Sequence, residues 1–400
     1  MTEVLTFGCR LNAYESEVIR GLTGHLGNTV VVNTCAVTAE AERSCRKAIR
    51  QVHRDRPDTE IVVTGCAAQI NPGAWAALPG VVRVLGNTEK LQARHWQPGA
   101  PSAVSDIRTV RTPEPHAVTG LSQRARAFVE VQQGCDHACT FCIIPWGRGL
   151  SRSVPAVAVV ERVRGLVGVG YAEVVLTGVD VASYGPTLGG MVRRVLADVP
   201  ELPRLRLSSL DPAALDDDIW WLLAEEPRFM PHLHLSLQAG SDLILKRMRR
   251  RHGRAEALQV IARARALRPG VAIGADLIAG FPTETEALFQ ETLAFVDEAA
   301  IPYVHVFPYS ERPGTSAARM PSVPAPLRRE RAARLRAAAS VHAAAFHAGQ
   351  VGRTVQVVVE RNRAGHTEHF SPVRLGADHA VGSLVALQVT GADALGLEAA

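Results

Sequence analysis

The chain has 400 residues, 47% of them hydrophobic, with a formal net charge of +5 at pH 7 and seven cysteines. This length favours two or three domains over one, and no apolar run reaches the ~18 residues that a membrane-spanning helix needs. The first residues lack the basic and apolar regions of a signal peptide, and an odd number of cysteines argues against a secreted disulfide framework. We therefore expect a cytoplasmic protein that is not inserted in a membrane and whose basic charge favours a polyanionic partner.

Apolar and amphipathic stretches alternate in residues 1–99, which we expect to form a small α/β domain. The predicted strands are Thr2–Thr6, Asn28–Asn33 and Glu60–Thr64, and the predicted helices between them are Tyr14–Thr23 and Ala39–Arg54. Strands that alternate with helices are typical of a parallel sheet. Cys9, Cys35 and Cys66 each follow closely after one of the three strands. Because ligands bind at the C-terminal ends of strands in such sheets, we expect the three thiols to meet at one edge.

Three cysteines at three strand ends favour a metal site, whereas single buried cysteines are common packing residues. We therefore predict that Cys9, Cys35 and Cys66 bind a metal, and three structural cysteines are the alternative. Cys45 lies within the predicted helix Ala39–Arg54 and is interpreted as a packing residue.

Strand and helix patterns repeat six times in residues 125–345, after a linker at residues 100–124 that is rich in Pro, Thr, Ser and Ala. The six predicted strands are Phe128–Gln132, Glu173–Thr177, Arg204–Ser208, His232–Leu237, Val271–Ile278 and Tyr303–Phe307. Six repeats predict an incomplete parallel (β/α)6 barrel with its site at the C-terminal ends of the strands. Residues 346–400 contain short alternating runs, which predict a small C-terminal β-barrel.

The loop after the first barrel strand carries Cys135, Cys139 and Cys142 in a C-x3-C-x2-C spacing. Iron–sulfur clusters take thiolate ligands, normally four for a four-iron cluster. Three close thiolates without a fourth predict a cluster with one iron open to a second ligand, as in the open position of a catalytic zinc site. A structural zinc loop with His137 as fourth ligand is the alternative, but this histidine lies inside the loop, where it would strain the geometry.

Polar residues follow several other predicted strands on the same face of the barrel. Ser209, Gln238 and Asp276 could hydrogen-bond to ribose or amino-acid groups, and packing within the barrel is the alternative for each. Gly178 would allow the backbone to approach a ligand closely.

A dense basic run predicts contacts with nucleic-acid phosphates. It consists of Lys246, Arg247, Arg249, Arg250 and Arg251. The alternative is a solvated helix end, which is the commoner origin of such runs.

Several further motifs extend from the first strand to the end of the predicted barrel. They are Gly8-Cys9-Arg10-Leu11-Asn12, Asn33-Thr34-Cys35, Gly65-Cys66, Arg148-Gly149, His232-Leu233-His234-Leu235-Ser236-Leu237-Gln238 and Gly280-Phe281-Pro282-Thr283-Glu284-Thr285. Together with the C-x3-C-x2-C loop, they resemble the methylthiotransferases, a branch of the radical S-adenosylmethionine (radical-SAM) superfamily, over nearly the whole chain. The segment from Cys9 to Cys35 is shorter than the family pattern, which keeps the ligands but alters the surface around them.

The resemblance implies two 4Fe-4S clusters and S-adenosylmethionine (SAM) as cofactors. Cys135, Cys139 and Cys142 would hold the cluster whose open iron binds SAM, and the three strand-end cysteines of the N-terminal domain would hold an auxiliary cluster. The candidate SAM contacts are Phe141, Thr177, Gly178, Ser209, Gln238 and Asp276. The C-terminal barrel would be a TRAM domain, which contacts RNA, and no catalytic side chain is assigned.

Within the family, two segments look most like the threonylcarbamoyladenosine branch. They are Leu176-Thr177-Gly178-Val179-Asp180 and Arg312-Pro313-Gly314-Thr315. This implies an enzyme that adds a methylthio group to C2 of N6-threonylcarbamoyladenosine at position 37 of tRNA, next to the anticodon. The alternatives are isopentenyladenosine in tRNA, a ribosomal-protein aspartate and, from another class, a non-catalytic metal-stabilised RNA-binding protein.

The implied chemistry is a radical route, because C2 of adenine is neither nucleophilic nor acidic enough for acid–base catalysis. An electron from the first cluster would cleave SAM, the resulting 5′-deoxyadenosyl radical would remove the hydrogen from C2, and sulfur would come from the auxiliary cluster. We expect a monomer, and the implied partners are the anticodon loop of tRNA, a low-potential electron donor and a sulfur donor.

Overall fold

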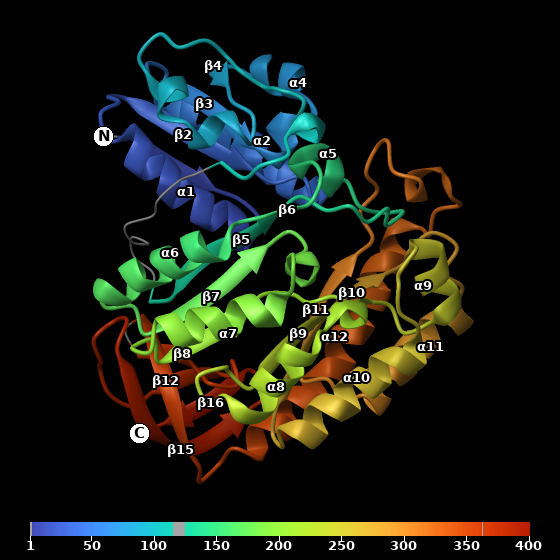
Figure 1. Cartoon of the computed structure of the whole chain (residues 1–400). Helices are drawn as coiled ribbons and strands as arrows, with labels where there is room; N and C mark the ends of the chain where they lie inside the picture. The colour runs from blue at the N-terminus through green and yellow to red at the C-terminus, as the bar shows by residue number, and fades with distance from the viewer. Residues whose placement is uncertain (1, 115–124, 362) are drawn as a thin grey trace.

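The computed structural model describes residues 2–114, 125–361 and 363–400. Three regions follow one another along the chain: an N-terminal parallel sheet with helices, a central incomplete barrel, and a small all-β barrel at the C-terminus (Figure 1). The predicted α/β fold class is therefore confirmed. The predicted domain boundaries stay a prediction, and residues 115–124 of the predicted linker lie outside the described residues.

The N-terminal sheet is fully parallel, with the strand order β1-β2-β3-β4. Its strands are β1 (Glu3–Thr6), β2 (Thr29–Thr34), β3 (Glu60–Gly65) and β4 (Val81–Val84), and its helices are α1 (Arg10–Thr23), α2 (Ala39–Asp55), α3 (Cys66–Ile70) and α4 (Pro72–Ala76). The valine runs 30–32 and 62–63 are fully buried, as central strands of a parallel sheet require. Ala103 of the predicted linker pairs with Leu85, so the first part of that segment packs beside β4.

Six parallel strands form the central barrel in the order β5-β7-β8-β9-β10-β11. They are β5 (Ala127–Gln133), β7 (Glu173–Gly178), β8 (Arg204–Leu207), β9 (His232–Gln238), β10 (Ala272–Ala279) and β11 (Tyr303–Pro308). The barrel strands belong to two sheets, and a pairing of Leu210 with Leu235 joins these sheets. The short strand β6 (Arg152–Ser153) runs antiparallel at the β5 edge.

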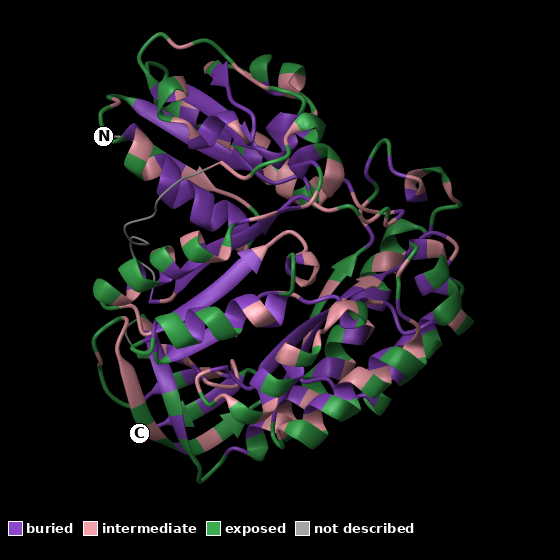
Figure 2. Cartoon of the chain, in the orientation of Figure 1, coloured by how far each residue is buried: buried purple, intermediate pink, exposed green. Residues whose placement is uncertain are grey.

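Helices cover the outside of the barrel, with buried inner faces and exposed outer faces (Figure 2). They are α6 (Ala156–Gly168), α7 (Leu188–Asp198), α8 (Asp217–Glu225), α10 (Arg254–Leu267), α11 (Glu286–Glu298) and α12 (Ala325–Ala348), and two short helices, α5 (Ile144–Arg148) and α9 (Asp242–Met248), lie near the strand ends. Helix α7 lies between the second and third barrel strands, as the repeated strand and helix pattern predicted, and its Gly189 packs so tightly that a Cβ would lie 2.3 Å from the Asp216 side chain. Among the described residues, no helix is long and apolar enough to cross a membrane.

The C-terminal region is a closed five-stranded barrel. Its strands are β12 (Thr354–Arg361), β13 (Ala364–Thr367), β14 (Pro372–Leu375), β15 (Leu384–Asp393) and β16 (Gly396–Ala399). Its core contains Val355, Val357, Val359, Val373 and Leu397. The alternation of these valines with polar residues is the pattern from which a small β-barrel was predicted.

One buried carboxylate organises the contact between the two barrels. Glu173 is fully buried and lies 2.8 Å from Arg204, 3.1 Å from Arg206 and 3.5 Å from Arg126. Arg204 and Arg206 also donate hydrogen bonds to Thr367 O in the C-terminal barrel, at 2.9 and 3.3 Å. Although burial alone would raise it, the three arginines hold the pKa of Glu173 at about 2. Glu173 thus orients the arginines that fasten the C-terminal barrel.

Replacing Glu173 with Gln is predicted to destabilise the protein by about 3–5 kcal/mol at pH 7, because the buried Arg204 and Arg206 lose their counter-charge. Urea unfolding followed by circular dichroism measures the loss. Glu201→Gln, at an exposed position, is the control and is expected to change stability by less than about 0.5 kcal/mol.

The same carboxylate predicts a pH dependence. Because its folded pKa is depressed from the ordinary 4.5 to about 2, its stabilisation is fully present above pH 4.5 and is lost as the pH falls through 2. The parent and Glu173→Gln curves should therefore converge in acid. Equal unfolding midpoints at pH 7 would contradict this role.

Candidate active site

Two tight glycine turns bring the three N-terminal cysteines together. Gly8 and Gly65 have positive φ values of 91° and 95°, which glycine adopts without steric cost. A Cβ on Gly8 would lie 2.6 Å from Sγ of Cys35. Cys9 precedes α1, Cys35 follows β2 and Cys66 begins α3. The structure therefore places these three residues, the N-terminal triad, at one edge of the sheet, where we expected them.

The thiols of the N-terminal triad repel one another when ionised. Burial, together with the charges of Cys66 and Cys9, raises the pKa of Cys35 to about 12. This coupling means that the sulfur atoms lie near one another. A bound metal or cluster would take the place of the thiol protons, since its positive charge stabilises thiolates. The donor set therefore fits a thiolate-ligated cluster.

Cys66 contacts a buried ion cluster that crosses from the N-terminal sheet to the barrel. Arg148, at the end of α5, donates a hydrogen bond from Nε to Cys66 Sγ at 3.0 Å. Its other nitrogens bind both carboxylate oxygens of Glu15 and, at 2.5 Å, Oδ1 of Asn12. Lys90 Nζ donates to Glu15 at 2.7 Å, and these three charged side chains are at most 2% exposed. One carboxylate thus holds two cations, and one of them faces the Cys66 thiol.

Cys135, Cys139 and Cys142, the loop triad, lie in the loop that follows β5. Cys142 N donates to Cys139 O at 3.1 Å, which folds the loop back on itself. Burial raises the pKa of Cys135 to about 12, and the charges of Cys142 and Cys139 contribute. Burial also raises the pKa of Cys142 to about 11, with a contribution from Cys66. The two triads therefore lie within electrostatic reach of each other.

The loop triad is fastened to the last turn of α9 and to the residues that follow it. Thr140 donates from its backbone N to Met248 O at 3.1 Å and from its hydroxyl to Arg247 O at 2.8 Å. Arg250 donates to Cys139 Sγ at 3.6 Å and to Ser236 O at 2.8 Å. These contacts place a guanidinium beside the loop sulfurs.

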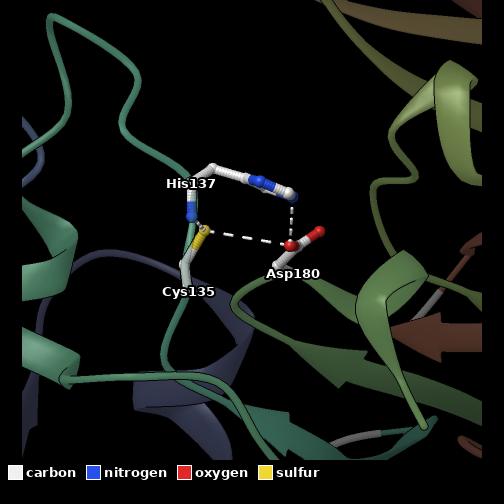
Figure 3. A group of neighbouring side chains, drawn as sticks. All are labelled: Cys135, His137 and Asp180. Carbon is white, nitrogen blue, oxygen red and sulfur yellow. Dashed lines mark hydrogen bonds and ion pairs between the residues drawn. The ribbon is translucent and has the colours of Figure 1, made fainter. Parts of the chain in front are cut away.

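One loop thiol has a histidine and a carboxylate beside it (Figure 3). Asp180 Oδ2 lies 2.8 Å from His137 Nε2 and 3.8 Å from Cys135 Sγ. The ligand atoms of these three residues all lie within 4.8 Å of one another, so the residues could hold a single metal ion. Such an ion would use one loop thiol and leave Cys139 and Cys142 without a role, so the loop fits a cluster better than zinc.

A cavity of about 550 Å³ lies between the N-terminal triad and the C-terminal ends of the barrel strands. This volume is within the range of small-molecule sites. Of the predicted SAM contacts, it is lined by Thr177, Gly178, Ser209 and Asp276. A smaller hollow of about 260 Å³ is lined by Phe141, Gln238 and again Asp276. A Cβ on Gly178 would lie 2.6 Å from Gln132 O, so the packing of β7 against β5 already requires this glycine.

Asp276 lines both hollows and has three partners. His234 Nε2 lies 3.1 Å and His305 Nδ1 3.3 Å from its Oδ1, and Ser209 donates to Oδ2 at 3.2 Å. Although burial alone would raise it, the hydrogen bonds from the two histidines hold the pKa of Asp276 well below its ordinary range. Both of its carboxylate oxygens therefore already have partners within the protein.

The predicted RNA-binding run divides into inward and outward side chains. Arg247, Arg250 and Arg251 have partners within the protein, although Arg251 is itself exposed, and Lys246 and Arg249 are exposed. Arg250 and Arg251 pair with Asp211 at 3.3 and 3.1 Å. The structure gives the side chains of Lys246 and Arg249 no hydrogen bond or ion pair with a described residue. Within the run, the phosphate-binding prediction therefore fits these two residues best.

The sequence analysis missed the ion cluster of Glu15, Lys90 and Arg148. Arg148 was noted only as part of a family motif, and Glu15 lay unremarked in a predicted helix. Lys90 and Glu15 are 75 residues apart, and Arg148 and Glu15 are 133 apart, so no local spacing could reveal their contact.

Comparison with known proteins identifies the family. Residues 129–296 match the Radical SAM superfamily, and residues 2–86 match the uncharacterized protein family UPF0004. A Rickettsia prowazekii protein named threonylcarbamoyladenosine tRNA methylthiotransferase MtaB is 48% identical over 97% of this chain and 94% of its own length. The Bacillus subtilis protein of that name is 34% identical over 96% and 92%. An Erythrobacter litoralis protein named tRNA-2-methylthio-N(6)-dimethylallyladenosine synthase is 35% identical over 96% and 94%.

A solved structure is similar in fold. The radical S-adenosylmethionine methyltransferase TsrM from Kitasatospora setae matches with a TM-score of 0.55 over 77% of this chain and 69% of its own, at 14% identity. Fold and sequence therefore define a radical-SAM enzyme, a class that implies SAM and a 4Fe-4S cluster as cofactors. Within this class, the chain belongs to the threonylcarbamoyladenosine tRNA methylthiotransferase family.

Replacing Glu15 with Gln is predicted to destabilise the protein by about 3–5 kcal/mol, because Arg148 and Lys90 would remain buried without a counter-charge. Urea unfolding at pH 7 measures the loss. In the double variant Glu15→Gln/Lys90→Met, one cation is removed as well, and a large part of the loss should be recovered.

Glu40→Gln removes an exposed ion pair with Arg43 and is the control, with an expected effect below about 1 kcal/mol. If the losses of unfolding free energy in Glu15→Gln and Lys90→Met simply add up in the double variant, the two residues do not act as a charge-balanced unit.

Proposed function

We propose that this protein adds a methylthio group to C2 of N6-threonylcarbamoyladenosine next to the anticodon of tRNA. The observation that carries the proposal is the cavity between the N-terminal triad and the mouth of the barrel. The loop triad lies directly after the first strand of that barrel. A base in this cavity is open to chemistry from two sides. The names of the relatives at 48% and 34% identity supply the substrate and the reaction.

We infer that each triad holds one 4Fe-4S cluster. Each offers three thiolates, one fewer than such a cluster normally takes, which leaves one iron for a further ligand. SAM at the loop triad would occupy the smaller hollow beside Phe141 and Gln238 together with the adjoining part of the larger cavity, since Asp276 lines both. The N-terminal triad lines the larger cavity and fits sulfur transfer to the base. When bound, SAM and the loop cluster supply a radical that can remove the hydrogen of C2.

The protein's own side chains position these groups and exclude water. Arg148 directs a hydrogen-bond donor at Cys66 from a site that is fully buried, and Arg250 does the same for Cys139. Hydrogen bonds to ligand sulfurs and the burial of the site are ways in which proteins set the potential of a cluster. Ser209 and the Asp276 carboxylate remain within the cavity as hydrogen-bonding groups for ribose or amino-acid atoms.

The proposed partner is the anticodon loop of tRNA, because its bases are unpaired and can be turned into a cavity at a small cost. The exposed Lys246 and Arg249 would contact its phosphates. The reaction also needs a low-potential electron donor and a sulfur donor, and we propose that the protein acts as a monomer in the cytoplasm.

Mass spectrometry of tRNA nucleosides tests this function. In a strain without the gene, N6-threonylcarbamoyladenosine should lack the methylthio group, and expression of the chain should restore the 2-methylthio form. The anaerobically prepared protein should hold about eight irons, as two four-iron clusters require. Restoration of the methylthio group on isopentenyladenosine instead would overturn the substrate. Stoichiometric zinc would favour a metal-stabilised RNA-binding protein.

Cys35→Ala is predicted to abolish methylthiolation while SAM is still cleaved under a strong reductant, because the variant removes a ligand from the N-terminal triad only. The assay measures 5′-deoxyadenosine and the 2-methylthio nucleoside in the same anaerobic samples. Cys45→Ala, a buried cysteine outside both triads, is the matched control and should make both products. Methylthiolation at the parent rate in Cys35→Ala would show that the N-terminal triad is structural.

The double variant Lys246→Gln/Arg249→Gln is predicted to bind tRNA more weakly and with a flatter salt dependence. The slope of log K against log salt should fall by about one unit per lost phosphate contact. Filter binding over a salt titration measures it, with Arg54→Gln on the exposed end of α2 as the control. An unchanged slope would indicate that the basic run is a solvated helix end that does not contact RNA phosphates.

A further inference from the structure

Arg10 is a charged side chain of the cavity without an internal partner. It follows Cys9 directly and lines the cavity together with the N-terminal triad. The structure gives its guanidinium no hydrogen bond or ion pair with any described residue. Its recorded contact is with the ring of Phe370, whose centroid lies 5.7 Å from Cζ. A guanidinium that rests on an aromatic face keeps its N–H groups free for a planar anion.

The surroundings of Arg10 carry an excess of positive charge. Arg10, Arg126 and Arg206 all lie against the ring of Phe370, with their Cζ atoms 5.7, 4.7 and 5.1 Å from its centroid. The nearest carboxylates are already engaged, because Glu173 is shared among three arginines and Asp276 is bound by two histidines and a serine. A partly buried cation in such a place is unfavourable unless an anion joins it. The geometry therefore favours a ligand that brings a negative charge.

Arg148, the other arginine that lines the cavity, does not fill this role. Its guanidinium is bound to Glu15, Asn12 and Cys66. Its charge is thus used within the protein, and the free guanidinium edge in the cavity is that of Arg10.

We propose that Arg10 binds the carboxylate of the threonylcarbamoyl group and so determines substrate specificity, an inference that rests on the proposed function. In adenine, the ring nitrogen N1 is bonded to C2 on one side and, on the other, to C6, the carbon that bears the N6 substituent. A base that turns C2 toward Cys9 therefore carries its N6 substituent on the edge that faces the neighbouring residue. The guanidinium fork of Arg10 matches a carboxylate, which it can bind with two parallel hydrogen bonds.

This contact would exclude a base with an apolar N6 substituent. An isopentenyl group would cover Arg10 without giving it an acceptor and would leave a desolvated cation. Sites built to hydrogen-bond a substrate group discriminate strongly against analogues that lack it. The clusters and the fold can then be shared by enzymes of either specificity, with the choice made by a side chain in the cavity.

The test measures binding of anticodon stem-loop RNA that carries either N6-threonylcarbamoyladenosine or its carboxamide analogue. For the cluster-loaded parent protein, loss of the carboxylate should weaken binding about 10- to 100-fold, the range of a hydrogen bond to a charged group. Arg10→Gln should bind both RNAs alike, and at the weaker level. Arg10→Lys keeps the charge but not the fork and should retain part of the preference.

Two measurements separate the carboxylate of the substrate from that of SAM and from RNA phosphates. Equilibrium binding of SAM should be equal for the parent and Arg10→Gln, and a loss would assign Arg10 to SAM and overturn the proposal. An equal loss of binding to both RNAs in Arg10→Gln, with a parent that does not distinguish them, would assign Arg10 to phosphate and overturn it too. Arg54→Gln is the matched control, and circular dichroism checks that Arg10→Gln is folded.

The outcomes also separate this inference from the proposed function. If the parent prefers the carboxylate RNA through Arg10 but tRNA from expressing cells gains no methylthio group, the proposed reaction fails and the Arg10 site stands. If methylthiolation is found but the carboxamide RNA binds and reacts as well as the carboxylate RNA, the function stands and the Arg10 site is wrong.

Discussion

The relative position of the two cysteine triads depends on the buried carboxylate of Glu15. A buried cation is stable only with a counter-charge in good geometry, so Arg148 from the barrel and Lys90 from the N-terminal domain must both reach this one group. Arg148 also contacts Cys66 and lies in the short helix that follows the loop triad. A rotation of one domain against the other would separate these charges. The ion cluster therefore opposes any change in the distance between the triads.

A second buried carboxylate repeats this arrangement on the other side of the barrel. Glu173 gathers Arg126, Arg204 and Arg206. Remaining donors of Arg204 and Arg206 bind backbone carbonyls of the C-terminal barrel, and Arg126 pairs with Glu360 of that barrel. The ring of Phe370 from that barrel lies against Arg126, Arg206 and also Arg10. The interior between the N-terminal triad and the C-terminal barrel is thus rich in cations. An anionic group on the substrate would be drawn toward this interior.

Local patterns in the sequence were sufficient for the fold and for the place of the cysteines. Valine runs and strand ends gave the parallel strands, and a short loop spacing gave the loop triad. The bounds of α7 could not be predicted in this way, because it begins with Leu188-Gly189-Gly190, whose glycines are weak helix formers that tertiary packing requires. The basic run shows another limit, because charge spacing does not give side-chain direction. Arg249 has a left-handed conformation with φ of 57°, and the chain turns there so that Arg250 points inward.

Two relatives whose names give different tRNA substrates match this chain over nearly its whole length, at 34% and 35% identity. The difference between those substrates is physical, since one N6 substituent ends in a carboxylate and the other is a hydrocarbon. Neither the cysteine ligands nor the core can sense that difference. It must be sensed by side chains that line the cavity and have a charge not already balanced within the protein. Among the cavity-lining residues that the structure describes, Asp276 and Arg148 have internal partners, and Arg10 does not. Substrate choice in this fold is therefore decided by the unbalanced charge of a side chain beside the N-terminal triad. The motif around Cys9 contains that side chain, but the sequence alone does not show that it lacks an internal partner.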